Sequence, residues 1–135
     1  MSSRLPALIG VIHLGPLPES PRFGGSLAAV VDDAVRDARV LVDAGFDGII
    51  VENFGDAPFV PGRVSPVTVA SMTAAAIAVR REAGGIPLGI NVLRNDAEAA
   101  LAVAVASGAE FIRINVHTGA RVTDPPSGSS RPPAI

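Results

Sequence analysis

Short runs of consecutive apolar residues alternate along the chain with longer segments in which apolar residues recur at helical spacing. The short runs occupy residues 8–13 (LIGVIH), 48–53 (GIIVEN), 87–92 (PLGINV) and 111–116 (FIRINV). Runs of this length, rich in β-branched residues, are typical of strands buried on both faces of a sheet. The alternation predicts a strand–helix repeat, and the short crossovers require the strands to run parallel.

The helical segments carry start and stop signals. Residues 26–44 place an apolar stripe opposite a face of aspartates and arginines. Ser65-Pro66 fits the N-cap and first position of a second helix, which Gly84-Gly85 ends. We expect a third helix to begin at a capping box made by Asn95 and Glu98 and to end at Gly108.

The predicted connections are unequal in length. Each helix is joined to the next strand by a few residues, whereas residues 14–25 and 53–64 join a strand to the next helix. Strand-to-helix loops usually have roughly 2–6 residues. The extra length therefore gathers at the carboxyl ends of the strands, where parallel α/β folds place their ligand sites.

Two parallel architectures fit this repeat. A doubly wound sheet that binds dinucleotides carries a glycine-rich turn after its first strand, but residues 14–25 read LGPLPESPRFGG, with prolines where that turn needs glycines. We therefore predict an α/β fold with a parallel (βα) repeat, the N-terminal half of a TIM (β/α)8 barrel.

Composition excludes several classes of function. The chain has 135 residues and a net charge of −2, with 48% hydrophobic and 18% charged residues. This balance indicates a folded domain and no nucleic-acid partner. All 11 basic residues are arginine and cysteine is absent, so neither a Schiff-base lysine nor a thiolate is available. We expect no cofactor, no metal and no transmembrane segment, and a cytoplasmic location.

Polar side chains stand at the ends of the predicted strands. Because side chains alternate across a strand, they are expected on one face of the sheet, at one edge. The residues concerned are His13, Glu52, Asn91, Arg113, Asn115 and His117. As acid–base groups, His13, Glu52 and His117 are the candidate catalytic residues.

Several candidate residues also have a purely structural interpretation. Glu52 and Arg113 could form an interior ion pair, and either histidine could cap a loop by hydrogen bonding. Asp56 could join Glu52 and His13 as a metal ligand, but an Asx turn beside a glycine is the interpretation we favour.

Four motifs resemble those of the BtpA family. They are GVIHLGPLP (residues 10–18), DGIIVENFGDAPF (47–59), PLGINVLRND (87–96) and FIRINVHTGA (111–120). The resemblance implies a barrel of the ribulose-phosphate-binding type and a role in photosystem I biogenesis, with peripheral membrane association, but it assigns no reaction. Motif positions that we consider candidates for substrate binding are Asn53, Asp56, Asn91, Arg94, Arg113, Asn115 and Thr118.

The sequence departs from the family pattern after Asp124. Family members continue there into further βα units, whereas residues 121–135 are rich in proline and serine. We expect a half-barrel domain at residues 1–120, a disordered tail at 121–135 and a truncated chain. The open edge of the half barrel suggests pairing of two copies.

Three functions are therefore compatible with the sequence. The first is a photosystem I biogenesis factor of unproven biochemical activity. The second is a lyase, isomerase or aldolase-like enzyme that acts on a phosphosugar or nucleoside-type small molecule without a Schiff-base lysine. The third is an inactive fragment.

Overall fold

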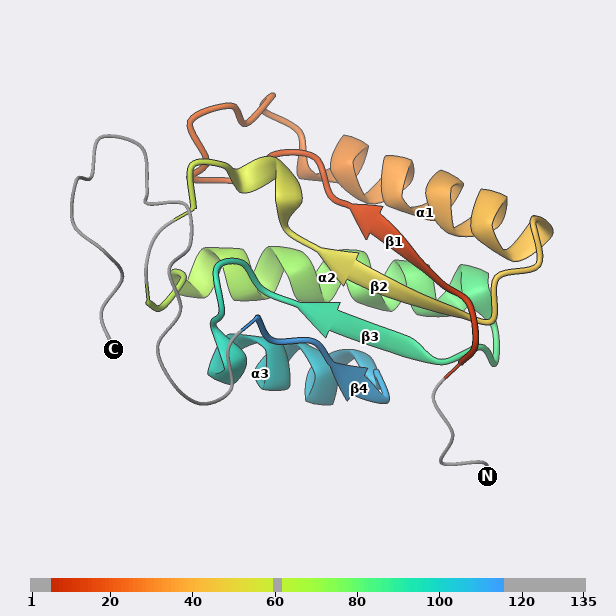
Figure 1. Ribbon diagram of the computed structural model, residues 1–135. Helices are drawn as coiled ribbons and strands as arrows, with labels where there is room; N and C mark the ends of the chain where they lie inside the picture. The colour runs from red at the N-terminus through yellow and green to blue at the C-terminus, as the bar shows by residue number, and fades with distance from the viewer. Residues whose placement is uncertain (1–5, 60–61, 116–135) are drawn as a thin grey trace.

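The computed structural model describes residues 6–59 and 62–115. Within these residues strands and helices alternate as predicted, and Figure 1 shows the four strands lying next to one another. The elements are β1 (Ile9–His13), α1 (Leu27–Asp43), β2 (Gly48–Glu52), the 3-10 helix η1 (Phe54–Asp56), α2 (Pro66–Ala83), β3 (Leu88–Asn91), α3 (Ala97–Ser107) and β4 (Phe111–Ile112).

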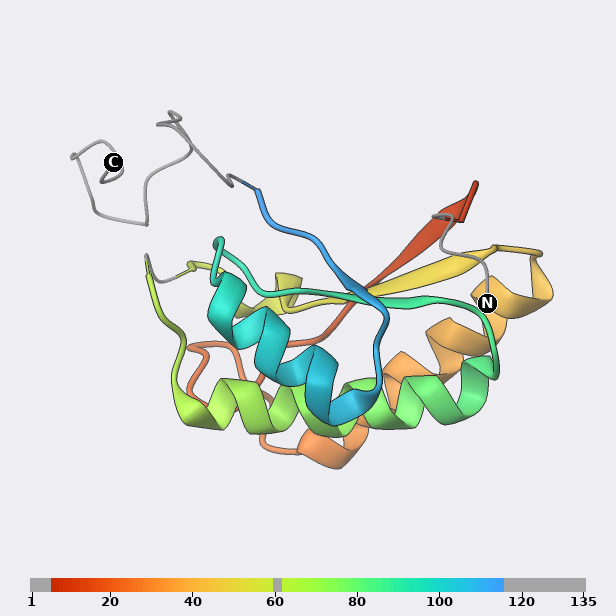
Figure 2. The ribbon, with the colours of Figure 1, turned by 90° about the horizontal axis from the view of Figure 1, so that it is seen from below.

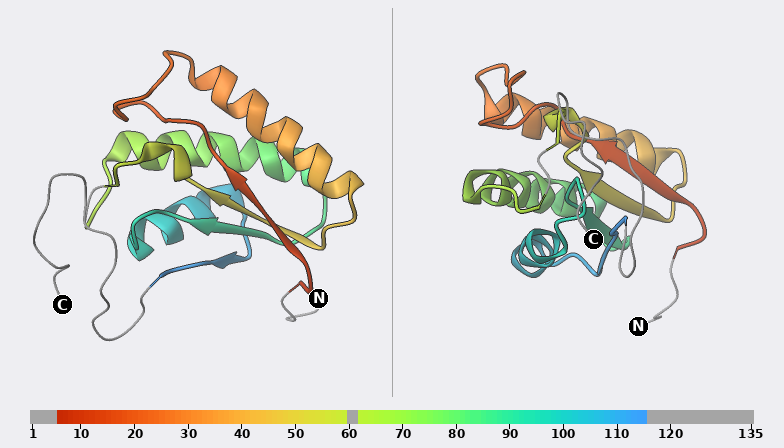
Figure 3. Two further views of the ribbon diagram at one scale, coloured as in Figure 1. Left: turned by 45° about the horizontal axis from the view of Figure 1, so that its top comes forward. Right: turned by 60° about the vertical axis from the view of Figure 1, so that its left-hand side comes forward.

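The strands form a parallel sheet in the order β1-β2-β3-β4. Figure 2 shows α1, α2 and α3 on the same side of this sheet. The right-hand view in Figure 3 shows α2 and α3 lying together on one side of the strands. A doubly wound sheet has helices on both faces, so that alternative does not describe residues 6–115.

The hydrophobic core fills the space between the sheet and the helices. Alternate side chains of each strand point into it, and small residues let the helices approach closely. Alanines that are completely buried here are Ala38 on α1, Ala75 and Ala76 on α2, and Ala100 on α3. The strands contribute Ile12, Ile49, Val51, Leu88 and Ile90.

The ends of α2 agree with the sequence, but the start of α3 does not. Ser65 caps α2 by accepting the N–H of Thr68 at 3.3 Å. At α3 the predicted capping box of Asn95 and Glu98 is wrong, since Asp96 is the N-cap.

Asp96 is the better cap because its carboxylate satisfies two backbone donors. Oδ1 accepts the N–H of Ala99 at 2.9 Å, and Oδ2 accepts that of Val64 at 2.8 Å. A single side chain therefore starts α3 and holds the loop that leads into α2.

The fourth strand is also shorter than predicted. It ends at Ile112, although the N–H of Arg113 still donates to the carbonyl of Ile90 at 2.9 Å. Two residues further on, the N–H of Asn115 donates to Asn95 Oδ1 at 2.8 Å, so a side chain accepts this hydrogen bond in place of a carbonyl of β3. The predicted tail at residues 121–135 lies outside the described residues.

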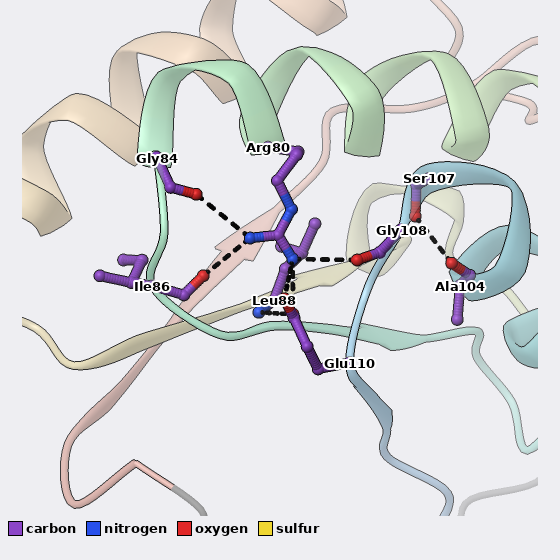
Figure 4. Close-up of polar contacts among 8 residues, drawn as sticks. All are labelled: Arg80, Gly84, Ile86, Leu88, Ala104, Ser107, Gly108 and Glu110. Carbon is purple, nitrogen blue, oxygen red and sulfur yellow. Dashed lines mark hydrogen bonds and ion pairs between the residues drawn. The ribbon is translucent and has the colours of Figure 1, made fainter. Parts of the chain in front are cut away.

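An arginine–glutamate pair ties the elements together at the amino end of the sheet (Figure 4). Arg80 on α2 donates to the carbonyls of Gly84, Ile86 and Gly108, and to the carboxylate of Glu110 at 2.6 Å. Glu110 in turn accepts the N–H of Leu88 at 2.6 Å. We call Arg80 and Glu110 the amino-end clasp, because they join the end of α2 to the starts of β3 and β4.

Candidate ligand site at the carboxyl edge of the sheet

A row of polar side chains crosses the carboxyl edge of the sheet. The register pairs His13 on β1 with Glu52 on β2, and Glu52 with Asn91 on β3. Arg113 follows directly after β4. These side chains share the far face of the sheet, the face turned away from α1, α2 and α3. The same-face arrangement predicted for these four residues is confirmed.

Glu52 stands at the centre of the row. Only 6% of the residue is exposed, and its Oε2 accepts a hydrogen bond from Asn91 Nδ2 at 2.9 Å. An imidazole and a guanidinium flank the carboxylate at longer range: His13 Nε2 lies 3.8 Å from Oε1, and Arg113 Nη1 lies 4.0 Å from Oε2. These distances exceed those of a close hydrogen bond, so neither group hydrogen-bonds directly to the carboxylate.

Asn91 leaves a polar atom unsatisfied beside this carboxylate. The residue is 1% exposed, and its Oδ1 has no hydrogen-bond partner in the described part of the chain. A buried acceptor without a partner costs about 1–3 kcal/mol. Such atoms are rare in native proteins, and a group that supplies the missing donor gains part of this energy back.

A cavity of about 340 Å³ opens over the polar row. We call it the rim cavity. Its aromatic wall includes Phe54, whose ring stacks on that of His13 with centroids 4.4 Å apart, and Phe59, which meets Phe54 edge-on. The rim cavity is lined by Val11, His13, Glu52, Phe54, Phe59, Asn91, Leu93, Arg94, Arg113 and Asn115.

The layer beneath the rim cavity is filled by one aromatic ring. Gly89 precedes Asn91 by two residues and is paired in register with Phe111. A Cβ atom placed on Gly89 would lie 2.2 Å from Phe111 Cε2, so the ring occupies the space of a side chain at position 89. Only glycine permits this close approach.

Asn53 and Asp56 belong to a second, neighbouring cavity of about 560 Å³ between the loops. Asn53 is buried, with Oδ1 accepting the N–H of Leu93 at 2.6 Å and Nδ2 donating to its carbonyl at 3.2 Å. This amide therefore fastens the loop after β2 to the loop after β3.

Asp56 holds the first loop in the same way. Its Oδ1 accepts the N–H of Leu17 at 2.8 Å, a contact with a residue far earlier in the chain instead of the local Asx turn that we favoured. Burial raises the pKa of Asp56, while the hydrogen bonds from Leu17 and Asn53 partly oppose that shift. Gly55 allows the approach, because a Cβ there would lie 2.5 Å from the carbonyl oxygen of Leu14.

The predicted site residues thus fall into three groups. His13, Glu52, Asn91, Arg94, Arg113 and Asn115 line the rim cavity, and Asn53 and Asp56 line the neighbouring one. His117 and Thr118 lie outside the described residues. The aromatic wall was not predicted, although two phenylalanines in the polar loop of residues 53–59 are a signal for it.

The rim cavity can bind through hydrogen bonds and charge. Its carboxylate and unpartnered amide oxygen are acceptors, and the arginines can pair with an anion. In the stretches 6–59 and 62–115, no three His, Asp or Glu side chains gather closely enough to share a metal ion. No helix in those stretches is both long and apolar enough to cross a membrane.

The fold and this edge define an α/β protein with a candidate small-molecule site at the carboxyl ends of parallel strands. The sequence matches the BtpA family over residues 4–128, and the chain belongs to that family.

Curated relatives come from distant organisms. An uncharacterised protein of Pyrococcus furiosus is 53% identical over 87% of this chain and 44% of its own length. The photosystem I biogenesis protein BtpA of Synechocystis is 54% identical over 87% of this chain and 40% of its own length. An uncharacterised mitochondrial protein of Caenorhabditis elegans is 34% identical over 92% of this chain.

The chain spans less than half the length of these curated relatives, between 40% and 46%. No solved structure matches it.

Proposed function

We propose that the chain forms the N-terminal half of a (β/α)8 barrel of the ribulose-phosphate-binding type, and that its rim cavity binds a small-molecule substrate. Sequential parallel strands with α1, α2 and α3 on one face support the barrel, because a TIM barrel is wound in this way. In such barrels the active site lies at the carboxyl ends of the strands, where the rim cavity is found.

The observation that carries this proposal is the unsatisfied acceptor at the centre of the cavity, next to a buried carboxylate. Asn91 Oδ1 has no partner among the described residues, and the carboxylate of Glu52 has its only hydrogen bond within those residues from Asn91. Buried groups with a purely structural role are normally satisfied by the protein. A ligand that donates hydrogen bonds would complete this pair.

In this proposal Glu52 is the general acid or base of a lyase, isomerase or aldolase-like reaction. The Asn91 amide orients the carboxylate by its 2.9 Å hydrogen bond. His13 lies close enough to exchange a proton with Glu52 through a small movement or a water molecule. Arg94, Arg113 and Asn115 would contact the substrate, whereas Asn53 and Asp56 would hold the loops around it.

Ligand-observed NMR of the full chain with a panel of small phosphorylated and carboxylated metabolites tests the proposal. We expect binders whose signal is lost in Asn91→Leu and weakened in Glu52→Gln. Glu98→Gln is the matched control, because Glu98 is an exposed carboxylate that pairs with Arg63 on the helix side. The proposal fails if no compound binds, or if the control lowers binding as much as Glu52→Gln does.

A second candidate function is photosystem I biogenesis, favoured by the name of the Synechocystis relative. The same proposal places the protein in the cytoplasm, with peripheral membrane association. A hybrid of that relative, carrying this chain in place of the matching segment, should restore photosystem I accumulation in a Synechocystis strain that lacks the gene. A stably expressed hybrid that leaves photosystem I depleted would contradict it.

A further inference from the structure

The rim cavity is polar at its floor and has the half-exposed guanidinium of Arg113 at its edge, and this combination restricts what it can bind. We propose that its ligand is a small anion with neighbouring hydroxyl groups, in which the hydroxyls donate to Glu52 and Asn91 and the anionic group pairs with Arg113. This inference rests on the proposed function, since it names the chemistry of the molecule in the same cavity.

The floor of the cavity calls for a donor-rich group. The carboxylate of Glu52 is an acceptor, and Asn91 uses its Nδ2 on Glu52, which leaves Oδ1 as a second acceptor without a partner in residues 6–59 and 62–115. Two acceptors on adjacent strands are satisfied by two O–H or N–H groups on neighbouring atoms. A pair of hydroxyls or an ammonium group meets that requirement.

The neighbouring guanidinium decides between these two donors. Arg113 Nη1 lies 4.0 Å from Glu52 Oε2. An ammonium group bound by Glu52 would therefore stand close to a like charge, which repels it, whereas hydroxyls carry no charge. Hydroxyls combined with an anionic group satisfy the acceptors and also attract the guanidinium.

Arg113 is well placed for the anionic group. Its side chain is 54% exposed, and Nη1 lies 4.0 Å from Glu52 Oε2, so the guanidinium is near the carboxylate without closing onto it. A guanidinium binds a carboxylate or a phosphate through two parallel hydrogen bonds. Because Arg113 and Glu52 are this close, the anionic and hydroxyl groups must be separated by only a few atoms.

The size of the cavity limits the ligand further. A volume of about 340 Å³ is near the lower end of small-molecule sites. Phe54 and His13 stack along one wall, and the ring of Phe111 fills the layer below. A molecule of few carbon atoms fits this space, and the shared chemistry is found both in hydroxy acids and in phosphorylated polyols.

Titrations of the ¹⁵N-labelled full chain, followed by amide shifts at the rim, test this inference without any variant. Glycerate and glycerol 3-phosphate carry both features, glycerol, propionate and inorganic phosphate carry only one, and alanine carries an ammonium group in place of the hydroxyls. We expect glycerate, glycerol 3-phosphate or both to bind about tenfold more tightly than the single-feature probes. Whichever of the two binds more tightly shows whether the anionic group of the ligand is a carboxylate or a phosphate.

Arg113→Gln tests the anionic contact separately. We expect it to weaken glycerate and glycerol 3-phosphate about tenfold and to leave glycerol unchanged. Arg36→Gln is the matched control, since Arg36 is an exposed arginine on α1 that pairs with Asp33.

The outcomes separate this inference from the proposed function. Equal binding of glycerol or propionate, tighter binding of alanine, or an unchanged affinity in Arg113→Gln would overturn the hydroxylated anion and keep a small-molecule site. If no probe shifts the rim amides and the metabolite panel also yields no binder, the site itself is refuted.

Discussion

The two ends of the sheet hold polar clusters of opposite character. In the amino-end clasp, Arg80 donates to three carbonyls and to Glu110, which in turn accepts the N–H of Leu88. At the carboxyl end, Glu52 has the imidazole of His13 at 3.8 Å and the guanidinium of Arg113 at 4.0 Å, and Asn91 Oδ1 lacks a partner among the described residues. The polar groups of the amino-end clasp are thus satisfied by the fold itself, whereas at the carboxyl end an acceptor is left over, which in our proposal a ligand would satisfy.

The largest effect should come from breaking the clasp. Arg80→Met keeps an unbranched apolar stem but removes every hydrogen bond of the guanidinium, leaving the carbonyls at 84, 86 and 108 without this donor. We expect the free energy of unfolding to fall by about 3 kcal/mol, measured by urea denaturation of the full chain. Arg36→Met, at an exposed ion pair, should change it by less than about 0.5 kcal/mol. Equal effects of the two variants would show that the clasp does not stabilise the fold.

The aromatic layer between the two clusters should come next. Gly89→Ala forces a methyl group into the ring of Phe111, and we expect a loss of about 2 kcal/mol in the same measurement. Combining it with Phe111→Leu should recover part of that loss, because the branched side chain can move aside. If the double variant is as unstable as the sum of the single variants, the contact is not the cause.

Asp56 should give a smaller effect that depends on pH. Burial raises its pKa in the folded chain above the ordinary value of 3.8, so the folded state holds the proton more tightly than the unfolded state. The resulting stability is fully present below about pH 3.8 and is lost as the pH rises through the folded pKa.

We test this with Asp56→Asn, which cannot titrate and whose Oδ1 can still accept the N–H of Leu17. Relative to this variant, the wild-type chain should be most stable in acid and should lose that advantage as the pH rises. Denaturation curves from pH 3 to pH 7 measure the difference. A difference that stays constant, or that grows with pH, would contradict the assigned sign.

The smallest change in stability is expected at the centre of the rim. Glu52→Gln keeps an acceptor for Asn91 and leaves Arg113, whose side chain is 54% exposed, in contact with solvent, so the free energy of unfolding should change by less than about 1 kcal/mol. The same variant should lower ligand binding, unlike the variants of the clasp. A loss as large as that of Arg80→Met would mean that Glu52 is a structural residue.

Periodicity was sufficient to predict the strand–helix order, because each helix and strand has its own repeat of buried positions. Ser65, Pro66 and Gly108 mark helix ends in the sequence as they do in the structure. The same-face position of His13, Glu52, Asn91 and Arg113 followed from strand parity, since parallel strands in register place such residues at one edge.

Contacts between distant parts of the chain could not be predicted in this way. Asp96 is the cap of α3, and its carboxylate also accepts the N–H of Val64, which belongs to another loop. Beyond the short fourth strand, the N–H of Asn115 donates to the side chain of Asn95 instead of to a neighbouring strand. The amino-end clasp and the contact of Asp56 with Leu17 likewise join residues far apart in sequence, and only the packed fold brings them together.

The ring of Phe111 over Gly89 closes the space below the rim cavity. In our proposal, a molecule bound by Glu52 and Asn91 would meet this ring one layer down. The length of the ligand would then be limited by residues that touch none of its polar groups. Exchanging Phe111 for a smaller residue would admit a longer molecule, while the hydrogen-bonding pattern that recognises its head stays as it is.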